Sequence, residues 1–234
     1  LIKVDKVQQA IEVYGLATLR LNLMVEKSKT KQYYTSLYFV EMGEALLASR
    51  LLAPDYFVQS FLFHGLKEAE KSQSQYLQAR AYKNLGNFFL TLEDKEEQGK
   101  ARSYFLAAFF LSKKIQNSVL MAQISTALGR DCAKQKEYTE ALEHYMLAYR
   151  IYQIKQYYFR QALVLSEIGG LYEKVAEYKR ALSFYQRSFE MIMHSERIEN
   201  NIKQKHYNRL HSKLIAIKSK IPDYQSLDHI FNLK

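Results

Sequence analysis

One stretch of the sequence returns after forty residues, as EYTEAL at 137–142 and EYKRAL at 177–182. Each stretch opens the same pattern, an alanine followed by an aromatic residue and a second small residue at helical spacing: Ala141, Tyr145 and Ala148; Ala181, Tyr185 and Ser188. A glycine precedes each first alanine by twelve residues, at Gly129 and Gly169. A recurrence of this length indicates that one supersecondary unit is repeated along the chain.

An earlier segment carries the same pattern with a longer gap. Leu85-Gly86 and Phe89 precede Ala101, Phe105 and Ala108, and Gly86 lies fifteen residues before Ala101, which indicates a three-residue insertion between 93 and 99. Gly43 lies forty-three residues before Gly86. We expect a degenerate copy there, with Gln59, Phe63 and Leu66 in the positions of the second helix.

The pattern has a physical explanation in helix packing. Glycine inside a helix costs about 1 kcal/mol of helix propensity. That cost is tolerable where a neighbouring helix has to come close. Small residues three to four positions apart on the second helix would line the other side of the contact, with the aromatic ring filling the space between them. The sequence therefore predicts helical hairpins stacked in register.

These residues resemble the tetratricopeptide repeat, in which one helix carries Leu-Gly and an aromatic residue and the next carries alanines around an aromatic residue. The resemblance implies an all-α, right-handed α-solenoid of helical hairpins with a C-terminal capping helix. The expected divisions of one repeat domain are an orphan second helix at 1–28, a degenerate repeat at 31–71, clear repeats at 74–115, 117–155 and 158–195, a capping helix at 197–220, and a short tail helix or tether at 223–234. Because the pattern starts halfway through a repeat, we expect the natural protein to continue N-terminally.

Composition supports an all-α chain and limits its chemistry. Two prolines and eight glycines in 234 residues are too few for the turns of an all-β fold. The single cysteine, Cys132, excludes an internal disulfide, takes a core position of the repeat, and fits a cytoplasmic location. We find no phosphate-binding glycine loop and no histidine pair with zinc-motif spacing. We therefore expect no enzyme activity, no cofactor and no metal site.

In such repeats the first helices line a concave groove, and the resemblance assigns positions around each Leu-Gly pair to it. The expected groove residues are Val40, Glu44, Leu47, Arg80, Lys83, Asn87, Leu90, Gln123, Thr126, Arg130, Ser166, Gly170 and Glu173. An asparagine amide can donate to one peptide backbone group and accept from another. Lys83 and Asn87 also match two positions of the carboxylate clamp that holds chaperone tails in some relatives, but Ala127, Leu163 and Glu167 depart from it, so we do not expect a chaperone co-factor.

The forty-residue period is similar to that of bacterial peptide-pheromone receptors of the Rap type and of sensor segments fused to output domains. The resemblance implies a protein- or peptide-binding module, the sensing or interaction region of a larger regulatory protein. Two alternatives stay open. One is an oligomerisation scaffold, such as a homodimer. The other uses the net charge of +10, with nucleic acid or an acidic partner binding a basic surface at Lys203, Lys205, Arg209 and Lys213. No stretch is apolar enough for membrane insertion.

Overall fold

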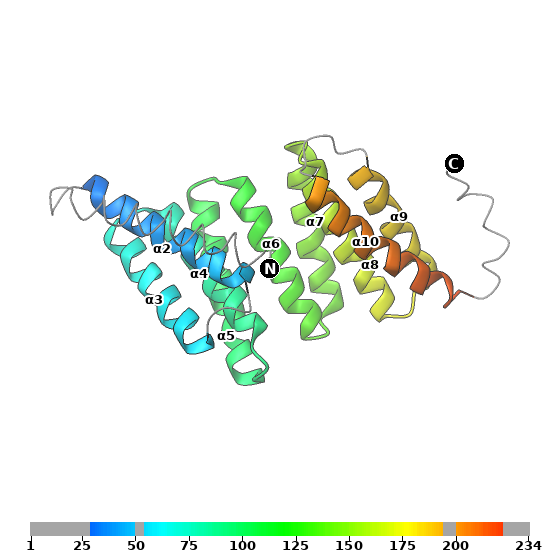
Figure 1. Cartoon of the computed structure of the whole chain (residues 1–234), viewed down its shortest axis with the longest axis horizontal. Helices are drawn as coiled ribbons and strands as arrows, with labels where there is room; N and C mark the ends of the chain where they lie inside the picture. Colours follow the sequence, from blue (N-terminus) through cyan, green and yellow to red (C-terminus); the bar gives the residue numbers. More distant parts are fainter. Residues whose placement is uncertain (1–28, 50–53, 194–199, 222–234) are drawn as a thin grey trace. The chain divides into compact units, whose positions relative to one another are not determined.

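The chain folds into α-helices throughout the part that a computed structural model describes, residues 29–49, 54–193 and 200–221. The expected helix at 1–28 and the segment at 223–234 lie outside these residues. The described helices are α2 (Lys29–Ser49), α3 (Asp55–Lys71), α4 (Gln75–Thr91), α5 (Lys95–Lys114), α6 (Ser118–Lys134), α7 (Tyr138–Ile154), α8 (Tyr158–Lys174), α9 (Tyr178–Met193) and α10 (Asn200–Lys218) (Figure 1). None of these helices is both long and apolar enough to cross a bilayer.

Two compact units divide the chain within α6, at Ala127 and Leu128. In the first unit, α2 packs on α3 and α4 packs on α5, while α3 and α2 both contact α4. In the second unit, α7 packs on α8, α8 on α9, and α9 on α10. Each unit is thus a stack of helical hairpins, and the predicted all-α solenoid fold with a helix packed on the last hairpin is confirmed.

The turns between helices follow one design. Three residues separate α6 from α7, α7 from α8, and α8 from α9. The last helical turn closes through a backbone N–H that reaches back five residues, as from Glu177 to Tyr172 C=O at 2.9 Å. The residue before that N–H takes a left-handed conformation, for example Ala176 at φ 60°. Identical turns give successive hairpins the same geometry.

In the three clear repeats, the glycine of the first helix lies against an aromatic ring of the second. A Cβ on Gly129 would lie 2.6 Å from the Tyr145 ring, and one on Gly169 would lie 2.8 Å from the Tyr185 ring. Both rings are at most 1% exposed, and the flanking alanines Ala141 and Ala181 are fully buried. The close approach that the sequence predicted is therefore the central packing contact of the repeat.

The three-residue insertion before Ala101 lengthens a helix and leaves the loop unchanged. Three residues separate α4 from α5, as they separate α6 from α7 and α8 from α9, but α5 is 20 residues long while α7 has 17. The extra turn begins at Asp94, whose carboxylate accepts from the N–H groups of Glu96 and Glu97 at 2.7 and 3.1 Å. This cap satisfies two of the free N–H groups at the new helix start.

The assignment of the degenerate repeat needs a correction of one residue. Gly43 meets Leu62, whose Cδ2 lies 2.6 Å from the position of a Cβ. Leu62 is 3% exposed, whereas Phe63, which was expected in the core, is 39% exposed. The fifteen-residue spacing of the longer repeat applies here as well, so the repeat positions are Val58, Leu62 and Gly65 in place of Gln59, Phe63 and Leu66, although Leu66 is also buried.

Candidate functional site

Polar side chains from three successive first helices meet in the first unit. Arg80 on α4 forms a two-pronged ion pair with Glu44 on α2, with Nη2–Oε2 at 2.9 Å and Nε–Oε1 at 3.2 Å. Lys83 lies one turn further along α4, and its Nζ donates to Glu44 Oε1 at 3.1 Å and to Gln123 Oε1 on α6 at 3.4 Å. The structure thus brings together four of the predicted groove residues, and we call them the α4 network.

The α4 network is close to electrically neutral. Glu41, one helical turn before Glu44, adds a second carboxylate, with Oε1 at 3.4 Å from Arg80 Nη1. Burial by itself would raise the pKa of Glu44, but the hydrogen bond from Arg80 and the charge of Lys83 outweigh burial and lower it. Glu44 is therefore held ionised, and each cation of the network already has a carboxylate partner.

Asn87 extends the same face of α4. Residues 80, 83 and 87 are three and four positions apart, which places them along one side of the helix. The Asn87 side chain is half-buried and makes no hydrogen bond to any described residue. Within the described part of the chain, both the donor and the acceptor of its amide are therefore unused.

Two expected groove residues belong to the core. Thr126 is 8% exposed and its hydroxyl donates within α6 to Ala122 C=O at 2.9 Å. Val40 is 1% exposed, and its carbonyl accepts from Asn84 Nδ2 at 3.0 Å. Neither side chain offers a polar group to a ligand, because the Thr126 hydroxyl is bonded within its own helix and the Val40 side chain has no polar atom.

A pocket of about 400 Å³ lies in the second unit. Its wall is formed by Ala133, Tyr145, Glu167, Gly170, Leu171, Glu173, Lys174 and Lys213. Of the predicted groove residues, Gly170 and Glu173 line it, and Arg130 lies beside it with Nε 3.5 Å from Glu167 Oε1. Ser166, one turn before Gly170 on α8, is half-buried and makes no hydrogen bond to the described part of the chain.

Glu173 is the most strongly held carboxylate of the pocket. It accepts from the Tyr185 hydroxyl at 2.9 Å and from Lys220 Nζ at 3.0 Å. Burial would raise the pKa of Glu173, but the bonds from Lys220 and Tyr185 and the nearby Lys213 lower it. Burial and the bond to Glu173 together raise the pKa of Tyr185, so this phenol stays protonated.

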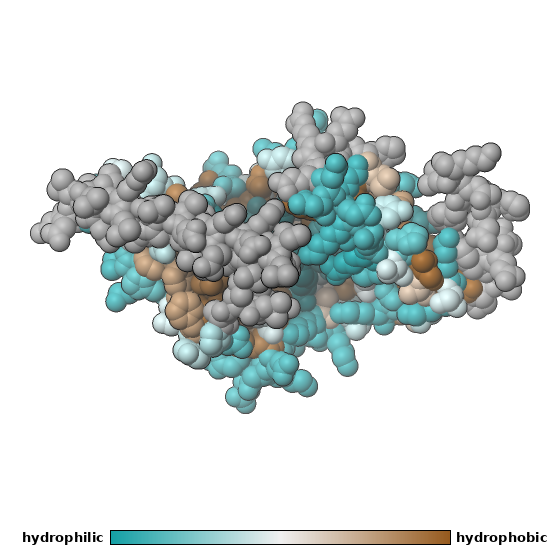
Figure 2. All heavy atoms as spheres, viewed as in Figure 1, coloured by the Kyte–Doolittle hydropathy of each residue, from teal (hydrophilic) through white to brown (hydrophobic). Residues whose placement is uncertain are grey.

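The predicted basic surface on α10 divides into residues with different surroundings. Lys213 turns into the pocket, where its Nζ lies 3.1 Å from the Tyr185 hydroxyl. Lys203 Nζ donates to Met193 C=O at the end of α9 at 2.6 Å. Lys205 and Arg209 are exposed, and Figure 2 shows hydrophilic residues covering the visible face of the first half of α10.

Comparison with known proteins agrees with this geometry. Residues 120–193, which cover α7, α8, α9 and most of α6, match a family model described as tetratricopeptide repeat. These residues form tetratricopeptide repeats. No curated protein matches the sequence.

Two solved structures share the fold with these tetratricopeptide repeats. BtubC (BKLC) from P. vanneervenii superposes with a TM-score of 0.70 at 15% identity, over 97% of this chain and 88% of BtubC. The apo form of RapI superposes with a TM-score of 0.65 at 17% identity, over 97% of this chain and 60% of RapI. The chain thus spans about three fifths of RapI, and at these identities the likeness establishes the fold.

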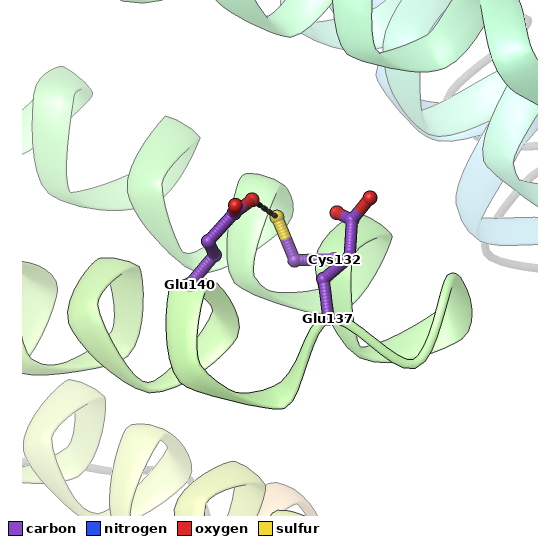
Figure 3. A group of neighbouring side chains, drawn as sticks. All are labelled: Cys132, Glu137 and Glu140. Atoms are coloured by element: carbon purple, nitrogen blue, oxygen red, sulfur yellow. Dashed lines mark hydrogen bonds between the residues drawn. The ribbon is translucent and has the colours of Figure 1, made fainter.

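Cys132 occupies a packing position of its tetratricopeptide repeat, at the end of α6. It is 2% exposed, and its Sγ lies 4.0 Å from Glu140 Oε2 (Figure 3). Cys132, Glu137 and Glu140 together form a group of potential metal-binding side chains, whose sulfur and carboxylate oxygen atoms all lie within 4.8 Å of one another. Glu140 is exposed at the start of α7, where acidic residues favour the helix dipole.

Several partners in these clusters were not predicted from the sequence: Glu41, Glu167, Tyr185 and Lys220. Glu41 carried a signal, since it repeats the acidic character of Glu44 on the same helical face. Tyr185 was assigned to packing alone, although a buried phenol needs a hydrogen-bond partner. Lys220 meets Glu173 across 47 residues of sequence. Nothing in the local pattern indicates that contact.

Proposed function

We propose that this chain is a protein- or peptide-binding module, the sensing or interaction region of a larger bacterial regulatory protein. Tetratricopeptide repeats typically serve as non-catalytic interaction modules, and the fold is shared with RapI. The observation that carries the proposal is the α4 network together with Asn87. Hydrogen bonds join the network across α2, α4 and α6, and Asn87 lies along the same side of α4.

This surface suits an extended backbone. The ion pairs between Arg80, Lys83 and Glu44 fix long side chains before a ligand arrives, which reduces the entropy lost on binding. Asn87 then offers both a donor and an acceptor beside them, the pair of groups that a peptide unit presents. A ligand would bind through neutral backbone groups at this surface, because the charges there are already paired.

A displayed random-peptide library selected on the protein tests this proposal. We expect a selected peptide to bind Asn87→Ala about tenfold more weakly than the wild type, since one or two hydrogen bonds are lost. Asn201→Ala, at an exposed asparagine near the start of α10, is the matched control and should bind normally. Equal affinity for the two variants, with unchanged circular dichroism, would argue against a ligand at this surface.

A second candidate rests on the exposed Lys205 and Arg209, four residues apart on α10. Two cations on one helical face favour an acidic partner or nucleic acid. Such binding would weaken steeply with salt and would be lost in the double variant Lys205→Gln and Arg209→Gln. Binding that withstands salt would favour the α4 network instead.

A further inference from the structure

Two lysines in the wall of the second unit's pocket, Lys174 and Lys213, form no ion pair with a carboxylate among the described residues. The two glutamates of the pocket are already engaged, Glu167 by Arg130 at 3.5 Å and Glu173 by Lys220 at 3.0 Å. Lys174 Nζ donates to Ala133 C=O at 3.2 Å. Lys213 bonds the Tyr185 hydroxyl and, among the described residues, forms no ion pair.

The fold holds the Lys213 cation at an unfavourable place. Burial and the positive charges of Arg209 and Lys174 lower the pKa of Lys213, and together they outweigh the nearby Glu167 and Glu173, which raise it. The ring of Tyr185, 4.7 Å from Nζ, offers a cation–π contact. Two of the three N–H donors of the ammonium group are still unused by the described residues, and an anion in the pocket would offset the cost of burying the charge.

Gly170 keeps this cation accessible. Its neighbour Gly169 is required for packing, because a Cβ there would lie 2.8 Å from the Tyr185 ring. A Cβ on Gly170 would meet only the Tyr185 hydroxyl at 3.6 Å and Lys213 Nζ at 3.9 Å, which are ordinary contacts. Packing therefore does not require glycine at 170, although glycine is among the least favourable residues inside a helix. What the missing side chain provides is open space above these two polar atoms.

We propose that this pocket binds a carboxylate of the peptide or protein partner, with Lys213 as the ion-pairing group and Gly170 as the opening. The inference rests on the proposed function, since it names a group of the same ligand. A carboxylate suits Lys213, because its two oxygens can accept from the two N–H donors that the described residues leave unused. A phosphate dianion would be repelled by Glu167 and Glu173 in the wall. The volume of about 400 Å³ admits one acidic side chain or a chain terminus.

Small probes test the pocket directly. The full chain, labelled at lysine with ¹³C and ¹⁵N, would be titrated with acetyl-Gly-Gly-Glu-amide, acetyl-Gly-Gly-Gly with a free C-terminus, acetyl-Gly-Gly-Gln-amide and inorganic phosphate. We expect a saturable shift of the Lys213 resonances at millimolar concentrations of one or both acidic peptides, and at least a fivefold weaker response to the glutamine peptide. Whichever acidic peptide binds identifies the source, a side chain or a chain terminus. Equal response to the glutamine peptide, tighter binding of phosphate, or no response would overturn the proposal.

Two variants separate the pocket from the fold. Lys213→Met keeps an apolar stem over Tyr185 and should abolish the preference for the acidic peptide. Gly170→Leu fills the opening and should weaken that peptide at least fivefold. Gly99→Leu is its matched control, because a Cβ on Gly99, in α5, meets nothing within 4 Å. If the acidic peptide binds folded Gly170→Leu as tightly as it binds the wild type, the pocket is not its site.

The two proposals can fail separately. A library-selected peptide that depends on Asn87 but ignores both Lys213→Met and replacement of its own acidic residues by amides would leave the function standing and remove this inference. If acidic probes bind at Lys213 while no library peptide is ever selected, the pocket inference stands and the proposed function is removed.

Discussion

The α4 network of the first unit and the pocket of the second place the same residue types, lysine and glutamate, in opposite electrical conditions. In the network, Arg80 and Lys83 each bond Glu44, and the charges compensate one another. In the pocket, Glu167 is paired with Arg130 and Glu173 with Lys220. Lys213 forms no ion pair with any described residue. The difference shows that a repeated helical framework can use charged side chains either to hold its helices together or to leave a charge for a ligand.

The largest expected effect on stability comes from substitutions at Gly169 and Gly170, next to Tyr185. Gly169→Ala should lower the free energy of unfolding by about 2–3 kcal/mol, because its Cβ would press on a fully buried ring. Gly170→Ala should raise that free energy by about 0.5–1 kcal/mol, because the helix gains a better residue and no clash. Urea unfolding measures both. A comparable loss in the two variants would mean that the pocket is part of the packed core.

Next in size is the loss of a cation from each cluster. Arg80→Met should cost about 1–2 kcal/mol of unfolding free energy, because Glu41 and Glu44 lose a charged hydrogen-bond partner that is 12% exposed. Lys213→Met should cost nothing measurable, since the removed charge has no carboxylate partner. Thermal or urea unfolding of the two variants measures both changes in unfolding free energy. A larger loss for Lys213→Met would contradict the contrast between the two clusters.

The pH dependence of stability should have the same sign at the two places, rising with pH, but in different pH ranges. The pKa of Glu44 lies below its unfolded value of about 4.5, so its contribution is complete above that pH and is lost as the pH falls through the folded pKa. Glu44→Gln should therefore reduce the loss of unfolding free energy at acid pH by less than about 1 kcal/mol, since the Glu44 side chain is about one third exposed. The measurement is the unfolding free energy of both proteins between about pH 6 and pH 3.

Lys213 has a pKa below its unfolded value of about 10.5, so the unfolded chain binds more protons and stability rises as the pH increases through the folded pKa. Lys213→Met should remove that rise. The charged and titratable groups that face Lys213 are Arg209 on α10, Tyr185 on α9, and Glu167, Glu173 and Lys174 on α8. A stability curve in which Lys213→Met shows the same alkaline rise as the wild type would assign the rise to one of these groups.

The smallest effect is expected from Lys220→Met. Its ion pair with Glu173 is solvent-exposed on the lysine side, so stability should change little. The pKa of Glu173 should move up toward its ordinary value, because the first of the bonds that lower it is gone. An NMR titration of the Glu173 side chain reads this shift. An unmoved pKa would mean that Tyr185 alone keeps this carboxylate ionised.

Sequence reasoning succeeded where the signal lies within one hairpin. The glycine–aromatic contact could be predicted because Gly129 and Tyr145 recur at fixed spacing with small residues around them. It failed by one residue at Gly43, where the longer spacing of the neighbouring repeat was not applied and Phe63 replaced Leu62 in the predicted core. Thr126 and Val40 were assigned to the groove because the resemblance places the positions around each Leu-Gly pair there. In the structure both side chains lie on the buried side of their helices.

The candidate sites depended on contacts that no local pattern encodes. Lys213 was grouped with Lys203, Lys205 and Arg209 as one basic surface, since all four lie on one helix. In the structure Lys213 bonds Tyr185, which lies 28 residues earlier in the chain, whereas Lys205 and Arg209 are exposed. The partner of a long, flexible side chain depends on the rotation of its helix against its neighbours, and the sequence period does not specify that rotation.

The sequence by itself determined the helical hairpin, its period and its core, because the spacing of small and aromatic residues along one chain leaves few ways to pack two adjacent helices. The tertiary structure alone decided which charges are paired and which one faces an open pocket. Ion pairs here join residues about forty positions apart, and their formation follows from how the hairpins stack within each unit. The repeat pattern predicts that a neighbouring hairpin exists. It does not set which atoms meet across the contact.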